Sequence, residues 1–352
     1  MLGGDFQIEP ELLLQADAKN SPLDQINECD LLLDTGRSAL RVAIANAIDA
    51  GQVKKAWVPF YSCHTMIQPF YEYGLEVNFY GVGNDLSSPV GLPDRLDGCL
   101  FLFTHYFGRY NEAIASYLSV ARTHNTVVIE DVVQSCMNMA HGKIGDYVVH
   151  SLRKFLPVPD GAVLTGPNVF NFDPLPANET FISLSLFSKI SRAAADLSDS
   201  RHVAIKIMAE DVLASCQAIR KVSSFTQQIL PKFDLSEIQS KRRQNWQQLS
   251  DAFATGALRN STLRPLYEYL PKDDVPLLFP VVVESYKRDA LLEKLRQEAI
   301  FCPIHWKLGN PNKAWLQSDF DLSRSLFSIP IDQRATSPIL DQAIYVLQRV
   351  EP

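Results

Sequence analysis

The sequence lacks the marks of a secreted or membrane protein. Its opening MLGGDFQIEP has neither the basic start nor the apolar run of a signal peptide, and no apolar segment is long enough to span a bilayer. The six cysteines include no C-x-x-C pair, which disfavours a disulfide framework and a zinc site, and we expect no metal. Repeats and low-complexity tracts are missing as well. We therefore expect a globular protein of the cytoplasm.

An excess of positive charge is also missing. The 352 residues carry 33 Lys and Arg against 40 Asp and Glu, a net charge of −7. Nucleic acids and anionic membranes require a basic surface, so neither is expected as a partner. The one dense basic spot, Lys241 to Arg243, falls in a helical pattern and is interpreted as a solvated helix face.

The first two-thirds of the chain alternates helical and strand patterns, which is typical of a mainly parallel sheet with helices on both faces. The expected helices are Arg37 to Ala50, His64 to Tyr73 and Asn111 to His124. The expected strands are Ala56 to Pro59, Leu75 to Val82, Cys99 to Thr104, Val127 to Glu130, Tyr147 to Leu152 and Ala162 to Thr165. The fold class is therefore α/β, a layered α/β/α domain.

Strand signals vanish from about Phe181, and helical periodicity dominates to about Thr255. After that tract, strands mix with helices. The expected strands are Val275 to Val283, Phe301 to His305 and Leu326 to Ile329, and the expected helices are Tyr286 to Glu298 and Ser337 to Val350. This shift predicts a large domain over residues 1–230 and a smaller α+β domain over residues 231–352.

Three strand ends carry polar residues, and open parallel sheets bind ligands at the carboxyl ends of their strands. The turn Asp34 to Leu40 (DTGRSAL) puts glycine, arginine and serine at a helix start. Backbone N–H groups, the positive helix end and a cationic side chain together suit a phosphate. An ordinary capped helix explains the turn equally well.

The stretch Val127 to Cys136 (VVIEDVVQSC) runs from a buried strand straight into two carboxylates. An uncompensated charge there costs several kcal/mol or so, which predicts a cation opposite Glu130 and Asp131. A helix cap by Asp131 is the alternative. Lys154 follows the next strand among apolar neighbours, which favours a lowered pKa and a covalent role, although a lone lysine is often an ordinary surface residue.

Taken together, these pieces resemble the DegT/StrS family of sugar aminotransferases, which are fold type I enzymes of the aspartate aminotransferase-like fold. The similarity runs from TGRSAL to the C-terminal helix. VPFYSCHT, THYFG, IEDVVQS and GDYVVHSLRKFLPVPDGA match family segments in order, and IHW and FSIPIDQR match the small domain. The resemblance implies pyridoxal 5′-phosphate as the cofactor.

The resemblance also implies roles for individual residues. Lys154 would bond the cofactor covalently, and Asp131 would pair with its ring nitrogen. Gln134 would lie near the ring hydroxyl, and Cys63 takes the place of a stacking aromatic ring. The expected phosphate site comprises Gly36, Arg37, Ser38 and Ser151. His105, His305 and Trp306 are candidate substrate residues.

The sequence departs from the family pattern at two further points. Ser151 and Lys154 stand closer together than usual, and no G-x-N-x-R segment, by which a neighbouring subunit reaches the phosphate, is present. Lys154 keeps the family distance to Asp160-Gly161, which favours it over Lys143 as the covalent lysine.

The expected activity is transfer of an amino group, from glutamate, to a keto sugar attached to a nucleotide, in cell-surface polysaccharide or secondary-metabolite biosynthesis. A homodimer with helical contacts over Phe181 to Gln228 is implied as well. Two alternatives remain open. The first is a sugar dehydratase that uses the same cofactor, although relatives of that kind carry histidine in place of the lysine. The second is a non-catalytic homologue with a binding or regulatory role.

Overall fold

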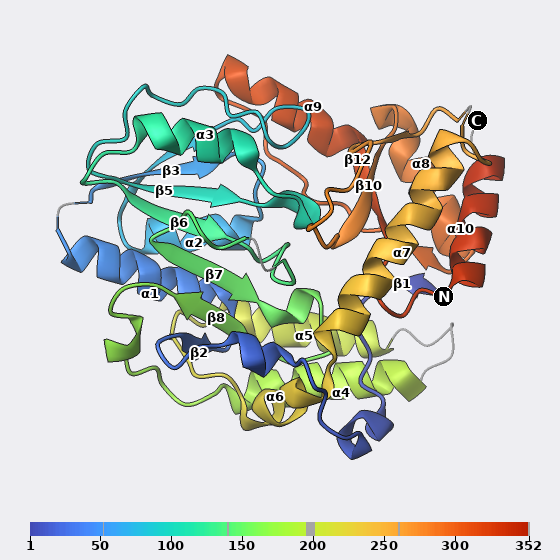
Figure 1. Ribbon diagram of the computed structural model, residues 1–352, viewed down its shortest axis with the longest axis horizontal. Helices are drawn as coiled ribbons and strands as arrows, with labels where there is room; N and C mark the ends of the chain where they lie inside the picture. The colour runs from blue at the N-terminus through green and yellow to red at the C-terminus, as the bar shows by residue number, and fades with distance from the viewer. Residues whose placement is uncertain (52, 139–140, 195–200, 260, 351–352) are drawn as a thin grey trace.

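The computed structural model describes residues 1–51, 53–138, 141–194, 201–259 and 261–350. A seven-stranded sheet forms its centre, in the order β2-β8-β7-β6-β5-β3-β4 (Figure 1). The strands are β2 (Leu31–Leu33), β3 (Lys55–Pro59), β4 (Glu76–Tyr80), β5 (Cys99–Thr104), β6 (Val127–Asp131), β7 (Tyr147–Ser151) and β8 (Ala162–Thr165). Strands β3 to β7 pair in parallel, and β8 is antiparallel to both β7 and β2.

Helices cover both faces of this sheet, as β5 illustrates. Phe101 and Phe103 belong to the apolar cluster that contains α3 (Glu112–Ala121), whereas Leu100 and Leu102 belong to the cluster that contains α1 (Gly36–Asp49) and α2 (His64–Glu72). Successive side chains of a strand point to opposite faces, so a wholly apolar strand needs cover on both sides. The predicted layered α/β/α fold is confirmed.

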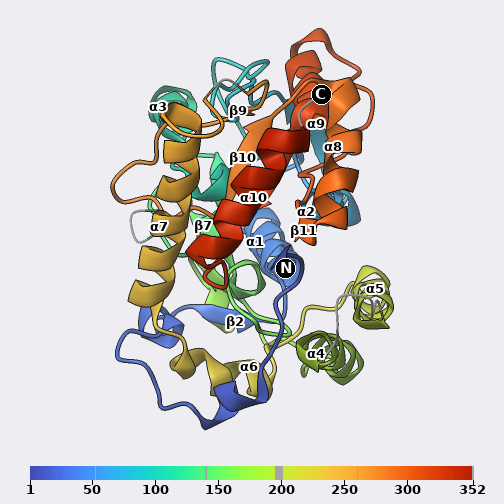
Figure 2. The same cartoon turned by 90° about the vertical axis from the view of Figure 1, so that its right-hand side faces the viewer.

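The C-terminal part forms a second layer beside the sheet. It contains the antiparallel sheet β12-β10-β9, flanked by helices (Figures 1 and 2). Its elements are α7 (Leu235–Ala254), β9 (Arg264–Pro265), β10 (Leu278–Val282), α8 (Ser285–Gln297), β11 (Ile300–Phe301), α9 (Gln317–Ser325), β12 (Leu326–Pro330) and α10 (Ser337–Val350). We propose the division near residue 230 as the domain boundary, five residues before α7 begins.

The structure of this region differs from the sequence-based expectation at two points. The strand expected over Phe301 to His305 is only the two-residue β11, which pairs with β1 (Leu2–Gly3) at the N-terminus. Pro303 has no N–H to donate to a ladder, which accounts for the early end. Helix α9 was not expected at all.

The predicted helical tract contains α4 (Glu179–Ala194), α5 (Arg201–Ala214) and α6 (Ser224–Ile229). Helices α4 and α5 lie side by side at one flank of the molecule (Figure 2). Residues 195–200, which the prediction included, lie outside the described part of the chain. Among the described residues, no helix is both long enough and apolar enough to cross a bilayer.

Candidate active site

A cavity of about 620 Å³ opens where the sheet meets the start of α1. The register of the parallel strands pairs Thr104 with Asp131 and Asp131 with Val149, so β5, β6 and β7 end at one edge. That edge faces the C-terminal layer. The cavity brings together nine of the eleven site residues expected from the sequence: Gly36, Arg37, Cys63, Asp131, Gln134, Ser151, Lys154, His305 and Trp306.

Asp131 is buried in the cavity wall, with 5% of its surface exposed. Its Oδ1 accepts a hydrogen bond from the Val133 N–H at 2.8 Å, and its Oδ2 accepts one from the Thr104 hydroxyl at 3.1 Å. Burial nevertheless raises its pKa to about 6, and the charge of Lys154 opposes that rise only in part. The carboxylate therefore has hydrogen bonds but no ion pair with any cation in the described part of the chain, which leaves it suited to a cationic ligand atom.

The neighbouring Glu130 is fully compensated by the protein. It accepts a 2.7 Å hydrogen bond from His105 and bonds of 2.8 Å from the N–H groups of Gly142, Ile144 and Gly145. Burial alone would raise its pKa, but these donors lower it to about 2. Of the two carboxylates that follow the buried strand, Glu130 is thus structural and Asp131 is available to a ligand.

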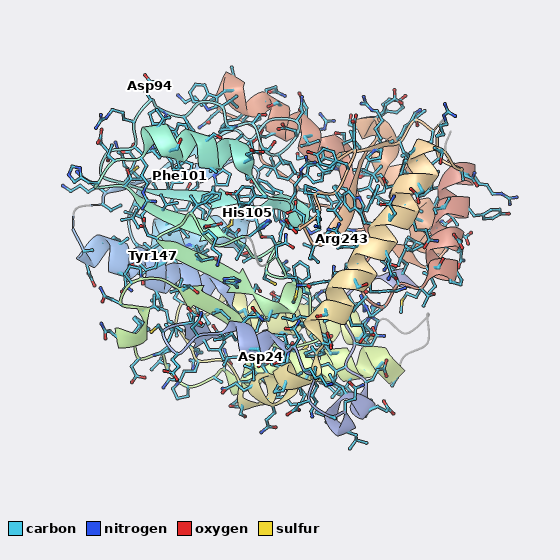
Figure 3. The ribbon with its side chains drawn as sticks, in the orientation of Figure 1. Asp24, Asp94, Phe101, His105, Tyr147 and Arg243 are labelled. Carbon is cyan, nitrogen blue, oxygen red and sulfur yellow. The ribbon has the colours of Figure 1, made fainter. Side chains whose placement is uncertain are left out.

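His105, expected as a substrate residue, does not line the cavity. His105 is fully buried, lies outside the cavity wall, and sits at the end of β5 (Figure 3). Its Nε2 bonds Glu130, and its Nδ1 accepts a 3.0 Å hydrogen bond from the Asn111 N–H, so both ring nitrogens are occupied. The ring is therefore neutral and donates its Nε2–H to Glu130, and burial lowers the pKa of His105.

Lys154 ends the short turn Leu152–Lys154 after β7 and projects its amine into the cavity. No described residue accepts a hydrogen bond or forms an ion pair with that amine. The side chain is exposed, yet desolvation by the surrounding protein lowers the pKa of the amine. A lysine with a lowered pKa is more often neutral and hence a better nucleophile and base.

The start of α1 forms one end of the cavity. Thr35 caps the helix by accepting a hydrogen bond from the Ser38 N–H. Arg37 is half-buried, burial lowers its pKa, and its guanidinium has no partner among the described residues. Ser38, expected at the phosphate, is instead buried behind the cap and does not line the cavity. Ser38 lies in the first turn of α1 with its side chain pointing inward, an orientation that the sequence motif alone does not predict.

The remaining predicted residues occupy other walls. Gln134 uses its Oε1 to accept a 2.8 Å hydrogen bond from the Phe107 N–H, which leaves its amide nitrogen free. The Cys63 sulfur lies 3.1 Å from the Thr65 hydroxyl at the start of α2. The rings of His305 and Trp306 meet edge to face, and burial lowers the pKa of His305 to about 3. His305 is therefore neutral near pH 7.

Several cavity residues were not found from the sequence. Helices α4 and α5 supply Lys189, Lys206 and Glu210, and the turn of Lys154 also supplies Arg153. Arg242 was expected on a solvated face, but it is fully buried, lines the cavity, and donates to the backbone oxygens of residues 276 and 277. Of these residues, the sequence could have indicated only Arg153, by its position beside Lys154. The others lie far away in the sequence.

Charge in the cavity is opposite in sign to that of the chain. Its wall contains seven arginines and lysines against four acidic residues, an excess of three positive charges. The whole sequence has a net charge of −7. This concentration of cations favours an anionic ligand. Within the described residues, no group of three or more His, Cys, Asp or Glu side chains is placed to hold a metal ion.

Comparison by sequence finds no matching family model and no matching curated protein. Comparison by structure finds the fold in sugar aminotransferases. An aminotransferase TlmJ from Streptoalloteichus hindustanus superposes with a TM-score of 0.68 at 14% identity, covering 99% of this chain and 98% of the other. PseC of Helicobacter pylori, an aminotransferase involved in the biosynthesis of pseudoaminic acid, gives 0.67 at 14% identity, covering 99% of each chain. A DegT DnrJ EryC1 StrS aminotransferase from Brucella abortus gives 0.59 at 14% identity, covering 91% and 85%. These likenesses show a shared fold.

Proposed function

We propose that this protein is a pyridoxal phosphate-dependent aminotransferase that moves an amino group from glutamate to a nucleotide-linked keto sugar. The observation that carries the proposal is one cavity, in the fold of sugar aminotransferases, that holds both an unpartnered lysine amine and a buried carboxylate without a cation. A binding protein has no physical need to keep Lys154 and Asp131 facing the same space.

The residues present fit this cofactor. Its phosphate suits the end of the cavity formed by Gly36, Arg37 and Ser151, where N–H groups, a cation and a hydroxyl are available. Asp131 suits the ring nitrogen, because a proton there gives the carboxylate the cation that it lacks. Gln134 has a free amide nitrogen for the ring hydroxyl. When bound, pyridoxal phosphate supplies an aldehyde that bonds amines and a ring that accepts electron density.

The chain's own groups would then perform the acid–base work. Lys154 Nζ, with its lowered pKa, would act as the base that carries a proton from the substrate carbon bearing the nitrogen to the cofactor, and back in the second half of the reaction. Asp131 keeps the ring nitrogen protonated through charge. Neutral His305 and the ring of Trp306 also line the cavity and would orient the sugar. The positive excess of the wall would favour the carboxylates of glutamate and the phosphates of a nucleotide.

The test is an assay of the purified protein, supplied with pyridoxal phosphate, against glutamate and a panel of nucleotide-linked keto sugars. We expect 2-oxoglutarate and an aminated sugar to form in equal amounts, as measured by mass spectrometry. A product that loses a hydroxyl without gaining nitrogen would show a dehydratase instead. Binding without any turnover across the panel would favour the non-catalytic alternative.

We further propose that a second copy of the chain covers the hairpin of α4 and α5, as the family resemblance implies. Helix α5 buries only Ala209 and Leu213, whereas Val203, Ile207 and Met208 remain exposed. These exposed residues sit on the helix that also supplies Lys206 and Glu210 to the cavity, so a partner here would border the site.

Light scattering in solution tests this interface. We expect a mass of twice 39.5 kDa for the unaltered protein and a predominantly single chain for Ile207→Glu, because an unpaired carboxylate at an interface is costly. Val120→Glu is the matched control: Val120 is an exposed apolar residue on α3, away from the hairpin, and its replacement should leave the dimer intact. A single-chain mass for the unaltered protein would contradict the interface.

A further inference from the structure

Several cationic side chains that line the cavity keep hydrogen-bond donors without partners among the described residues. Besides Arg37, these are Arg153, on the turn after β7, and Lys206, on α5. All three act on the same acid, because Arg153, Lys206 and Arg37 together lower the pKa of Glu210 although its burial opposes this. Three cations from three separate elements thus line one cavity near the same carboxylate.

Arg153 is fixed in place but has donors to spare. Its Nη2 donates to Glu210 at 2.6 Å, and its guanidinium stands over the Phe181 ring at 5.2 Å. Neither Nε nor Nη1 bonds any described residue. A planar guanidinium held on one side and free on another can receive an anion with little loss of conformational entropy. Glu210 is therefore a positioning residue for Arg153.

Lys206 is not neutralised by the acid nearest to it. Its amine lies 3.8 Å from Asp5, but Lys189 is closer to the same carboxylate, at 3.2 Å, and donates a hydrogen bond to it. One carboxylate thus faces two ammonium groups. Lys189 is almost completely buried, whereas Lys206 is 44% exposed and borders the cavity. The surplus positive charge therefore belongs to Lys206.

We propose that Arg153 and Lys206 bind a phosphate group of the ligand alongside Arg37, so that a single chain provides the cationic part of the phosphate site. A phosphate offers oxygens to several donors at once, and arginine can meet two of them. The phosphate belongs either to the cofactor or to the nucleotide of the substrate. This inference rests on the proposed function for the identity of the ligand, although not for its anionic chemistry.

The test compares ligands that differ only in phosphate. The variants are Arg153→Met and Lys206→Met, with Arg122→Met and Lys221→Met as controls, since the control residues also pair with carboxylates but lie outside the cavity wall. Dissociation constants are measured by absorbance titration for pyridoxal phosphate and for pyridoxal, and by calorimetry for pyrophosphate. Thermal unfolding of each variant checks the fold.

If the cations hold the cofactor phosphate, both variants should weaken pyridoxal phosphate about tenfold or more and leave pyridoxal unchanged. If they hold the substrate phosphate, pyrophosphate binding to the cofactor-loaded protein should weaken by a similar factor and pyridoxal phosphate should not. The controls should change neither. Unaltered binding of all three ligands to both variants would overturn the inference.

Two outcomes separate this inference from the proposed function. A protein that binds pyrophosphate through Arg153 and Lys206 but takes up no pyridoxal phosphate would end the proposed function and keep the anion site. A protein that binds both pyridoxal phosphate and pyrophosphate equally well with and without these cations would do the reverse. If Arg153→Met fails to fold, the Lys206→Met variant still tests the inference, because Lys206 is half-exposed and its replacement should not disturb the fold.

Discussion

Replacing Lys154 with alanine should abolish amino transfer, with a loss of at least about 10⁴-fold in kcat. The substitution removes both the nucleophile that bonds the cofactor and the base that moves the proton, and general base catalysis alone accounts for about 10²- to 10⁴-fold. The visible absorbance of the lysine-bound cofactor should disappear at the same time. Assay of the variant with glutamate, together with its absorbance spectrum, measures both effects.

The matched control for this variant is Lys143→Ala. Lys143 precedes β7, as Lys154 follows it, but its side chain is exposed and lies outside the cavity wall. Its loss should leave turnover and spectrum unchanged. Full activity in Lys154→Ala, or loss of activity in the control, would show that the wrong lysine has been assigned.

Replacing Asp131 with asparagine should lower activity by at least about a hundredfold while making the cofactor-free protein more stable. The pKa of Asp131 rises from 3.8 to about 6 on folding, so the folded protein binds this proton more tightly than the unfolded chain does. Above pH 6 the ionised carboxylate therefore destabilises the fold, by roughly 3 kcal/mol at most. Asparagine removes that cost but cannot hold a cationic ring nitrogen by charge.

The stabilisation by Asp131→Asn should depend on pH in a defined direction. The stabilisation by Asp131→Asn should be complete above about pH 6 and should fade as the pH falls toward 3.8, where the carboxyl is protonated in both states. Urea unfolding of the cofactor-free proteins across this range measures it. A variant that is less stable than the unaltered protein at pH 8 would contradict the electrostatic account of Asp131.

Glu130→Gln provides the matched comparison, with the opposite sign. Its pKa falls from 4.5 to about 2 on folding, so its ionised form stabilises the fold above pH 4.5 by roughly 3 kcal/mol, and this contribution is lost as the pH drops through about 2. Glutamine should therefore destabilise the protein at neutral pH. Adjacent carboxylates that shift stability in opposite directions would be hard to explain by packing alone.

Much of the fold could be predicted because the signals are local. The apolar run Cys99 to Thr104 must be covered on both faces, and the structure places it in the interior of the central sheet. The helix expected from Asn111 is present as α3, and the Asn111 side chain caps it by accepting a hydrogen bond from the Ile114 N–H. By contrast, β11 depends on pairing with the N-terminal Leu2–Gly3, a contact across nearly 300 positions that no local pattern encodes.

The residues of the candidate site also fall into those that local sequence patterns predict and those that depend on contacts far apart in the sequence. Asp131, Ser151 and Lys154 share one edge because parallel strands end together, so their order along the chain was enough to group them. Arg242 and His105 were misjudged because a charge cluster and a histidine give no sign of their partners. Arg242 is satisfied by backbone oxygens, and His105 by Glu130 and a backbone N–H. Which polar residue faces a ligand depends on these tertiary contacts.

The most direct test of the central claim is reductive trapping on the unaltered protein. The protein is loaded with pyridoxal phosphate, treated with borohydride and digested, and the modified peptide is identified by mass spectrometry. We predict a single modification by the reduced cofactor, on Lys154, with loss of the visible absorbance. Cofactor attached to another lysine, or no attachment at all, would contradict the claim that Lys154 and Asp131 form a pyridoxal phosphate site.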